Sequence, residues 1–289
     1  MKVSELEQLW SAALNEVLGG EIESTELHIL ARQTEDSIRR VDIYDSYRLK
    51  AENATESRAP FIHTSNPLVL AQRSDLSLTD KVWILYLATY FGKSDKSNWE
   101  LFKRASFRED KSLIGFNEIQ SDPGAFFDYL SSFNFFDGCS YSNHRKFTAK
   151  HLEGPKGVFR SMKYFIDNIH EYSRSEPIEF EEMNKLALKI PNFGRLGAFD
   201  FTSTLVKCQC NVNEPNSMYA EGSSGPLDGL KLLLEKTNNE TSDKAQIQLS
   251  YDLMEWFAQN SSIFMLGQVL EDAVCNWQKN TVVYKRYTG

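Results

Sequence analysis

The sequence predicts a mainly α-helical protein. Apolar residues recur at helical spacing along most of the chain, runs of them end at glycine, and alternating strand patterns are almost absent. Of the 289 residues, 41% are hydrophobic and 12% aromatic, which indicates a packed globular protein rather than a disordered one. A chain of this length forms one large domain or two modest ones.

The N-terminal part predicts two helices followed by a linker. Residues 3–18 carry apolar side chains at helical spacing and stop at Gly19-Gly20, as expected beyond a helix C-terminus. A second helix should run from Ser24, which suits an N-cap, to about residue 54. Residues 55–77 are polar and contain two prolines, which indicates a loop. We therefore divide the chain into an N-terminal helical segment with its linker, 1–75, and a second helical domain, 76–289.

The second domain contains one segment that should lie at its centre. Residues 80–91 predict a helix that is apolar on nearly all sides, as a central core helix is. Short helices rich in aromatics follow over 98–136, and three more helices are expected at about 228–236, 243–259 and 264–279. The tail from residue 281 to residue 287 is expected to be a strand or a loose end.

Charge and motif content exclude several classes of function. The net charge of −8 argues against non-specific binding of polyanions by the whole surface. Four cysteines without zinc spacing and five histidines without a paired arrangement predict no metal site, and no cofactor-binding motif is present. No secretory signal opens the chain, and the longest apolar run is about half of a membrane span. We expect a soluble, cytoplasmic protein that does not bind membranes.

One stretch is clearly basic. Residues 143–163 contain six lysines and arginines against a single acid, with aromatic residues between them and a Gly-Pro-Lys-Gly turn. Such a stretch could hold phosphates through its cations and through the amides of the turn. A solvated loop followed by an amphipathic helix fits the composition equally well.

The stretch between residues 190 and 230 has a glycine-containing turn at each end, and each turn leads into an apolar helix. Turns of this kind present unpaired backbone N–H groups, to which a phosphate can bind. On a helical wheel of residues 196–210 most of the circumference is apolar, including Leu196, and one narrow sector holds Asp200, Ser203, Thr204 and Lys207. That pattern is typical of a helix lining a pocket, although a solvated face would give it too.

A second acidic candidate lies in the last predicted helix. Glu271 sits just off the apolar stripe of that helix, beside Asp272, and Lys279 falls two turns later near the same side. A half-sheltered carboxyl group is one whose pKa can be raised, as a general acid or base requires. An ordinary surface acid would show the same pattern.

Several of these elements together resemble a known family. Ile190-Pro191-Asn192-Phe193-Gly194-x-x-x-Ala198 resembles the hairpin of helix–hairpin–helix DNA glycosylases, with Asn192 in place of a glycine that has positive φ. In combination with Gly225-Pro226-x-x-Gly229-Leu230, with Glu271-Asp272-x-x-Cys275 and with the Asn143-His144-Arg145-Lys146 element, the chain resembles the third clade of the α-glutamyl/putrescinyl-thymine pyrophosphorylase family. The resemblance covers about residues 80–280 and leaves the first 75 residues outside.

The resemblance implies a helical, glycosylase-like domain with a helix–hairpin–helix-like turn, and a DNA glycosylase acting on a hypermodified pyrimidine. The family is related to DNA glycosylases and includes an anti-phage enzyme that removes glucosylated hydroxymethylcytosine. The expected partner is double-stranded phage DNA containing modified bases, with the target base flipped and abasic sites left as a defence. Two alternatives stay open: a transferase or pyrophosphorylase that installs the modification, and a non-catalytic reader of modified DNA.

Roles for individual residues follow from this hypothesis. Asp200 is the first candidate for the catalytic carboxylate, followed by Glu271 and its neighbour Asp272. The residues expected to hold DNA or the base are His144, Arg145, Lys146, Asn192, Phe193, Gly194, Arg195, Ser223, Ser224, Gly225 and Lys279. The sequence carries no signal for an oligomeric state.

Overall fold

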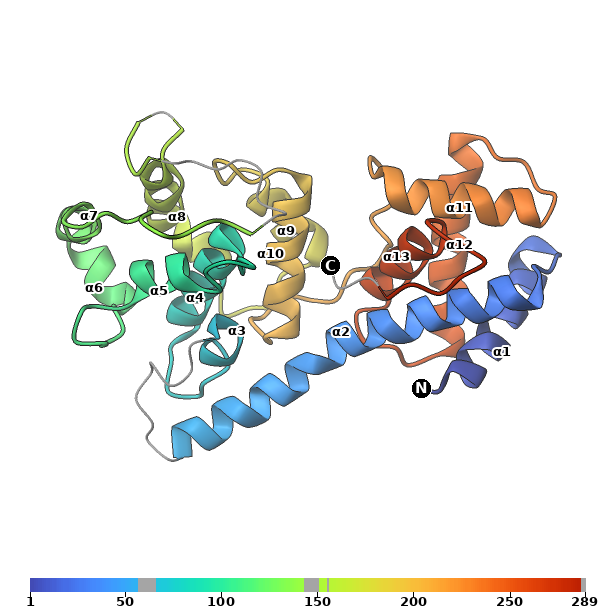
Figure 1. Ribbon diagram of the computed structural model, residues 1–289, viewed down its shortest axis with the longest axis horizontal. Coiled ribbons are helices and arrows are strands. Elements are labelled where there is room, and N and C mark those ends of the chain that lie inside the picture. The colour runs from blue at the N-terminus through green and yellow to red at the C-terminus, as the bar shows by residue number, and fades with distance from the viewer. Residues whose placement is uncertain (57–65, 143–150, 155, 287–289) are drawn as a thin grey trace. The chain divides into compact units, whose positions relative to one another are not determined.

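The computed structural model describes residues 1–289 except 57–65, 143–150, 155 and 287–289 (Figure 1). The described residues form thirteen α-helices and one π-helical turn, with three isolated β-bridges and no strand. The mainly α-helical prediction is confirmed, whereas the helix–hairpin–helix-like turn stays a prediction. No helix in these described ranges has the length and apolarity that crossing a membrane requires.

The chain folds into two compact units. Unit 1 consists of Met1–Ile43 and Glu214–Gly289, and unit 2 of Tyr44–Asn213. The long helix α2 (Ser24–Glu56) begins in unit 1 and ends in unit 2. The division of the chain into residues 1–75 and 76–289, which we made from the sequence, stays a prediction.

Unit 1 joins the two ends of the chain around one core. Its helices are α1 (Val3–Ala13), the π-helical turn (Leu14–Leu18), the first part of α2, α11 (Ser224–Lys236), α12 (Asp243–Asn260) and α13 (Leu266–Trp277). Trp10 and Trp277 are fully buried there, and the Trp10 ring packs edge-on against Phe257 with centroids 4.8 Å apart. Each indole is also hydrogen-bonded to α2: Trp10 Nε1 donates to Thr34 Oγ1 over 2.8 Å, and Trp277 Nε1 to the Glu26 carbonyl over 3.0 Å. Such bonds satisfy the polar edge of a buried indole.

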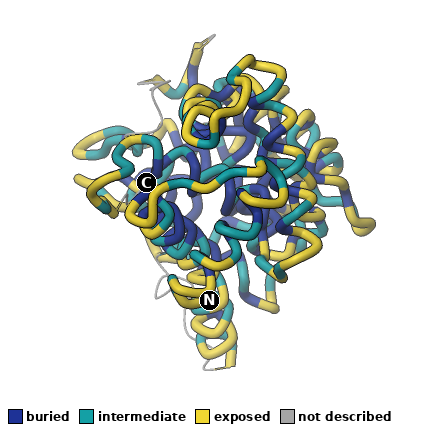
Figure 2. Tube along the Cα trace, turned by 90° about the vertical axis from the view of Figure 1, so that its right-hand side faces the viewer, coloured by how far each residue is buried: buried dark blue, intermediate teal, exposed yellow. Residues whose placement is uncertain are grey.

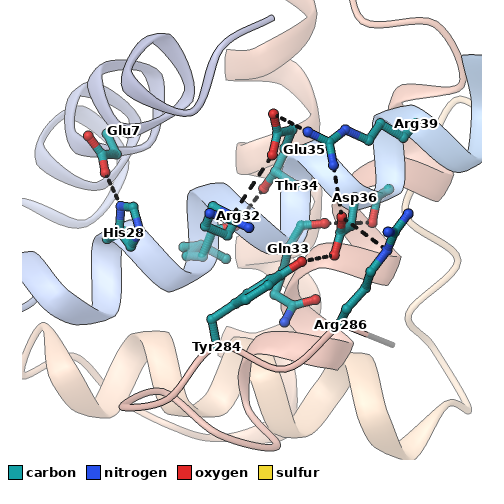
Figure 3. Close-up of polar contacts among 12 residues, drawn as sticks. Glu7, His28, Arg32, Gln33, Thr34, Glu35, Asp36, Arg39, Tyr284 and Arg286 are labelled. Atoms are coloured by element: carbon teal, nitrogen blue, oxygen red, sulfur yellow. Dashed lines mark hydrogen bonds and ion pairs between the residues drawn. The ribbon is translucent and has the colours of Figure 1, made fainter. Parts of the chain in front are cut away.

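The C-terminal tail of unit 1 is fastened to α2 (Figure 3). Gln33 Nε2 donates to the Lys285 carbonyl over 2.9 Å, and the Tyr284 hydroxyl donates to the buried carboxylate of Asp36. The Arg32 guanidinium lies 4.3 Å from the centroid of the Tyr284 ring. The tail is therefore neither a strand nor a loose end over its described residues, because buried polar groups of α2 need it as a partner.

Unit 2 is built around the helix that the sequence places at its centre. Residues 82–91 of α4 (Leu78–Phe91) are all buried, and Figure 2 draws such residues in dark blue. Tyr86 of α4 stacks on Phe165 with ring centroids 4.0 Å apart. The other helices of this unit are the end of α2, α3 (Pro67–Leu70), α5 (Glu100–Ser106), α6 (Phe116–Ser121), α7 (Pro123–Ser131), α8 (Val158–Tyr172), α9 (Phe180–Ala187) and α10 (Arg195–Lys207).

Candidate functional site

The turn that leads into α10 is fixed from inside unit 2. Asn192 has φ +70°, a left-handed conformation that asparagine tolerates better than most residues, and its Nδ2 donates to the Tyr90 hydroxyl over 3.0 Å. The Phe193 ring is buried and stacks near Tyr86 and Tyr90, at centroid distances of 6.0 and 6.2 Å. Phe193, which we expected to touch DNA or a base, thus anchors the turn in the aromatic core.

The first turn of α10 faces solvent. Gly194 is the N-cap residue and is exposed, as are Arg195 and Leu196 after it. As a glycine, Gly194 has no side chain with which to cap the helix. A helix start with its positive dipole end in solvent can receive an anion such as a phosphate.

Asp200 lies farther along α10 and is half-buried. In the same polar sector Ser203 and Thr204 are buried, and Thr204 Oγ1 donates back to the Asp200 carbonyl over 2.7 Å. Burial of these hydroxyls shows that most of the sector is not a solvated face. Leu196, which the wheel counts with the apolar positions, is 54% exposed instead, because the first turn of α10 extends beyond the core.

Tyr44, from the part of α2 in unit 2, covers this polar sector. Its side chain is hydrogen-bonded to Thr204, and Lys207 Nζ lies 4.9 Å from its ring centroid. Burial raises the pKa of Tyr44 far above its ordinary value; the nearby Cys208 and Asp200 add to the shift, and the bond with Thr204 opposes it. Tyr44 therefore stays a neutral hydrogen-bonding phenol close to Asp200 at neutral pH.

In unit 1 the start of α11 is pressed against α13. A Cβ atom added to Gly225 would lie 2.5 Å from Cys275 Sγ, and one added to Gly229 would lie 2.8 Å from the Val274 carbonyl carbon. At Gly229 the near atom is backbone and cannot move aside, so only glycine allows the approach there. The approach brings residues 223–225 beside the face of α13 that carries Cys275. Six of the predicted site residues thereby belong to one group, formed by Ser223, Ser224, Gly225, Glu271, Asp272 and Lys279.

Charged groups surround Cys275 in this group. Burial raises the pKa of the Cys275 thiol, with Glu271, Asp272 and Asp228 adding to the shift and Lys279 opposing it. On α2, Arg40 Nη2 lies 3.3 Å from Asp272 Oδ2 and donates to Ser37 Oγ over 2.8 Å. Asp272 therefore has a cationic partner, and the acidic side of α13 is half-buried rather than an ordinary surface.

The remaining predicted residues differ in how they are placed. Ser223 is buried, and its hydroxyl donates to the Ala220 carbonyl over 2.5 Å, whereas Ser224 is exposed. Lys279 is exposed, and its Nζ donates to Asn276 Oδ1 over 2.8 Å. His144, Arg145 and Lys146 lie outside the described residues.

Sequence reasoning missed Arg40 and Tyr44, the two residues that α2 supplies to these groups. Both lie in a part of α2 that is rich in charged residues, so nothing in the local pattern distinguishes them from their neighbours. An i, i+4 pair of a cation and an aromatic residue is the only local signal, and it is a weak one.

The charge of the chain is unevenly distributed. Unit 1 contains 19 acidic and 10 basic residues, whereas unit 2 contains 21 acidic and 22 basic residues. The whole acidic excess thus belongs to unit 1. In the described part of the chain, no three His, Cys, Asp or Glu side chains come together as a metal site would need.

Comparison with known proteins identifies one family. The sequence model of the family described as alpha-glutamyl/putrescinyl thymine pyrophosphorylase clade 3 matches residues 25–289. The match confirms the resemblance. The expectation that the first 75 residues lie outside the family is wrong for residues 25–75. The reason is that α2 contains none of the glycine and acid motifs on which the resemblance depends. No curated protein and no solved structure is similar enough to the chain to count as a match.

Proposed function

We propose, from the premise that the chain belongs to the alpha-glutamyl/putrescinyl thymine pyrophosphorylase family, clade 3, that it is a DNA glycosylase for a hypermodified pyrimidine. The family description names a modified thymine, which supports a modified base as the substrate. Phage DNA with glucosylated hydroxymethylcytosine or a similar base is the proposed target, and its abasic products would serve in defence against the phage.

The observation that carries this proposal is the position of Asp200. The acid is half-buried, five residues after the exposed start of α10 at Arg195. Five residues correspond to about 7.5 Å along a helix axis. A phosphate bound at the helix start and the sugar of the same flipped nucleotide can span such a distance, so the carboxylate is within reach of the glycosidic bond.

In the proposed reaction, the target base is flipped out of the duplex. As the bond between C1′ and the base nitrogen breaks, the electron pair leaves with the base and the sugar becomes oxocarbenium-like. The Asp200 carboxylate stabilises this positive charge and accepts a proton from the water whose oxygen bonds to C1′. The departing base takes up a proton, and an abasic site remains.

In each unit taken by itself, one helix start would contact the DNA backbone. Residues 194 and 195 of unit 2 and residues 223–225 of unit 1 present backbone amides, with His144, Arg145, Lys146 and Lys279 as further contacts. Contacts of this kind position the DNA without reading its sequence. Glu271 is the alternative catalytic acid; we rank Asp272 after it, because the Arg40 guanidinium lies 3.3 Å from its carboxylate.

The family description favours one competing function. A pyrophosphorylase acts on a pyrophosphate, so the enzyme could instead install a modification, with an amine displacing pyrophosphate from an activated hydroxymethyl-pyrimidine. The same helix starts suit a pyrophosphate as well as a DNA phosphate. The substrate distinguishes the two functions, since installation consumes an activated base and an amine and leaves the glycosidic bond intact.

The test is to incubate the full chain with phage DNA containing glucosylated hydroxymethylcytosine or another hypermodified pyrimidine, and with unmodified DNA of the same sequence. Hydrolysis predicts free modified base by mass spectrometry and alkali-labile strands, on modified DNA only. Pyrophosphate release from activated DNA in the presence of an amine would establish the installing reaction instead. Binding to modified DNA without any product would identify a reader.

Two substitutions then separate the acids. Asp200→Asn should lower the rate by about 10²–10⁴-fold while leaving DNA binding intact, as expected for loss of a group that assists proton transfer. Asp167→Asn is the matched control, because Asp167 is an exposed acid on α8 of the same unit. If Glu271→Gln abolishes the reaction and Asp200→Asn does not, the catalytic carboxylate belongs to unit 1.

A further inference from the structure

Exposed apolar side chains in unit 2 concentrate at one place. In the described part of this unit, three large hydrophobic residues are exposed: Leu49, Leu188 and Leu196. Leu188 is 46% exposed at the end of α9, and Leu196 is 54% exposed in the first turn of α10. Two of the three thus flank the turn that joins these helices. Single exposed leucines are common on protein surfaces, but two on one turn indicate a binding surface.

The turn holds both leucines outward on a fixed support. Ile190 and Phe193 between them are buried, and the Phe193 amide donates to the Ile190 carbonyl over 3.0 Å. Asn192 fastens the turn to Tyr90 of α4, as described above. Residues 188 and 196 therefore project from a backbone that the core positions, rather than from a loose loop that could fold its apolar groups away.

Each leucine stands next to an exposed cation in the sequence. Lys189 follows Leu188, and Arg195 precedes Leu196. An apolar side chain beside a cation suits a nucleic acid, whose base stack accepts an apolar wedge while its phosphates pair with the cation. A purely apolar protein interface would instead be depleted of lysine.

Leu196 is also aligned with Asp200. Residues four apart on an α-helix lie on the same face, with Cβ atoms about 5–6 Å apart. The exposed leucine at the tip of α10 therefore stands one turn above the half-buried acid, on the side where we place the sugar of the flipped nucleotide.

From this arrangement we propose that Leu196 enters the base stack and fills the gap left by the flipped nucleotide, with Leu188 contacting the neighbouring base pair. This inference rests on the proposed action on a flipped base. It assigns Leu196 a positioning role: the side chain keeps the duplex open so that the base stays in its pocket, and it takes no part in bond breaking.

The test compares Leu196→Ala with Leu49→Ala, the same substitution at the other exposed leucine of unit 2. Duplex DNA carries the modified pyrimidine with 2-aminopurine, a base whose fluorescence rises on unstacking, as its neighbour. Leu196→Ala should lower both the fluorescence rise and the rate of base removal from duplex, by at least about tenfold if the wedge offsets the unstacking cost. Leu49→Ala should behave as the wild type.

A second substrate separates the wedge from a merely structural effect. When the modified pyrimidine lies in single-stranded DNA, no gap in a duplex needs filling, so Leu196→Ala should be as active as the wild type. Equal loss on both substrates, or full activity of Leu196→Ala on duplex, would overturn the wedge.

The outcomes also separate this inference from the proposed function. A wild-type protein that unstacks 2-aminopurine without releasing a base still tests the wedge, although it would refute hydrolysis. A Leu196→Ala protein with unchanged DNA behaviour but an altered sedimentation coefficient would show that the leucines bind protein instead, and would overturn the inference.

Discussion

Replacing Gly229 by alanine sets two opposing effects against each other. Gly229 lies inside α11, where alanine is favoured over glycine by about 1 kcal/mol through helix propensity. The added methyl group, however, would lie 2.8 Å from the Val274 carbonyl carbon of α13, and closer still to its oxygen. A backbone carbonyl cannot rotate away as a side chain can, so α11 and α13 must separate.

The cost of that separation follows from the packing on both sides. Leu230, Leu233, Val274 and Trp277 are all fully buried at or near this contact, so moving one helix opens voids around large side chains. Overpacking of this kind costs about 1–3 kcal/mol. Since the clash is with backbone atoms, we expect a cost in the upper part of that range, about 2–3 kcal/mol. After the gain of about 1 kcal/mol from helix propensity is subtracted, Gly229→Ala should lower the free energy of unfolding by about 1–2 kcal/mol.

Urea unfolding followed by circular dichroism measures this difference, with the whole curve analysed because two units can unfold in separate transitions. Gly197→Ala is the matched control: Gly197 is also buried in a helix, but its added Cβ would lie 3.5 Å from the Phe193 ring, an ordinary van der Waals distance. The control should be unchanged or slightly stabilised. A Gly229→Ala protein as stable as the wild type would refute the close approach of α11 to α13.

Three further predictions follow from buried polar contacts. Tyr284→Phe removes the hydroxyl that donates to the buried carboxylate of Asp36, so the free energy of unfolding in urea should fall by about 1–3 kcal/mol. Asn192→Ala loses the bond to Tyr90 and forces alanine to positive φ, so its melting temperature should fall clearly more than that of Asn192→Gly, which keeps the backbone relaxed. Burial raises the pKa of Tyr86 well above its ordinary value and that of Tyr90 to about 12. As the pH rises, these tyrosines therefore ionise in the unfolded chain before they ionise in the folded protein, which favours unfolding. The melting temperature should be insensitive to these groups below about pH 9 and should fall as the pH rises toward 12.

The sequence alone predicted those helices and helix ends that are determined by the residues of the segment itself. The run of apolar residues at 82–91 predicted the central helix, and Gly19, with φ +63°, ends the first helical segment as a left-handed cap does. Periodicity shows which face of a helix is apolar, but not which other helix covers it. The packing of Trp10 against Phe257, far away in the sequence, therefore required the structure.

Some residues of the candidate site could likewise be predicted from the sequence, whereas others required the structure. The wheel singled out Asp200, and the structure places it half-buried, with Ser203 and Thr204 buried in the same sector. The wheel could not place Leu196, because it assumes that the core extends along the whole helix. It also could not find Tyr44, because a contact between α2 and α10 leaves no trace in either segment alone.

For the proposed DNA interface, the distribution of charge limits how much affinity the phosphate backbone can supply. With 19 acidic against 10 basic residues, unit 1 repels a phosphate backbone at long range, and unit 2, with 21 against 22, neither repels nor attracts it strongly. Affinity for DNA must then come from a few local contacts, such as the start of α10 and the cations near it, rather than from a broad basic surface. A protein with few phosphate contacts gains little from binding to unmodified DNA, since non-specific affinity is supplied by those contacts. Under the proposed function, contacts of the flipped base near Asp200 and the leucine at the tip of α10 would therefore provide much of the selectivity for a modified base over ordinary DNA.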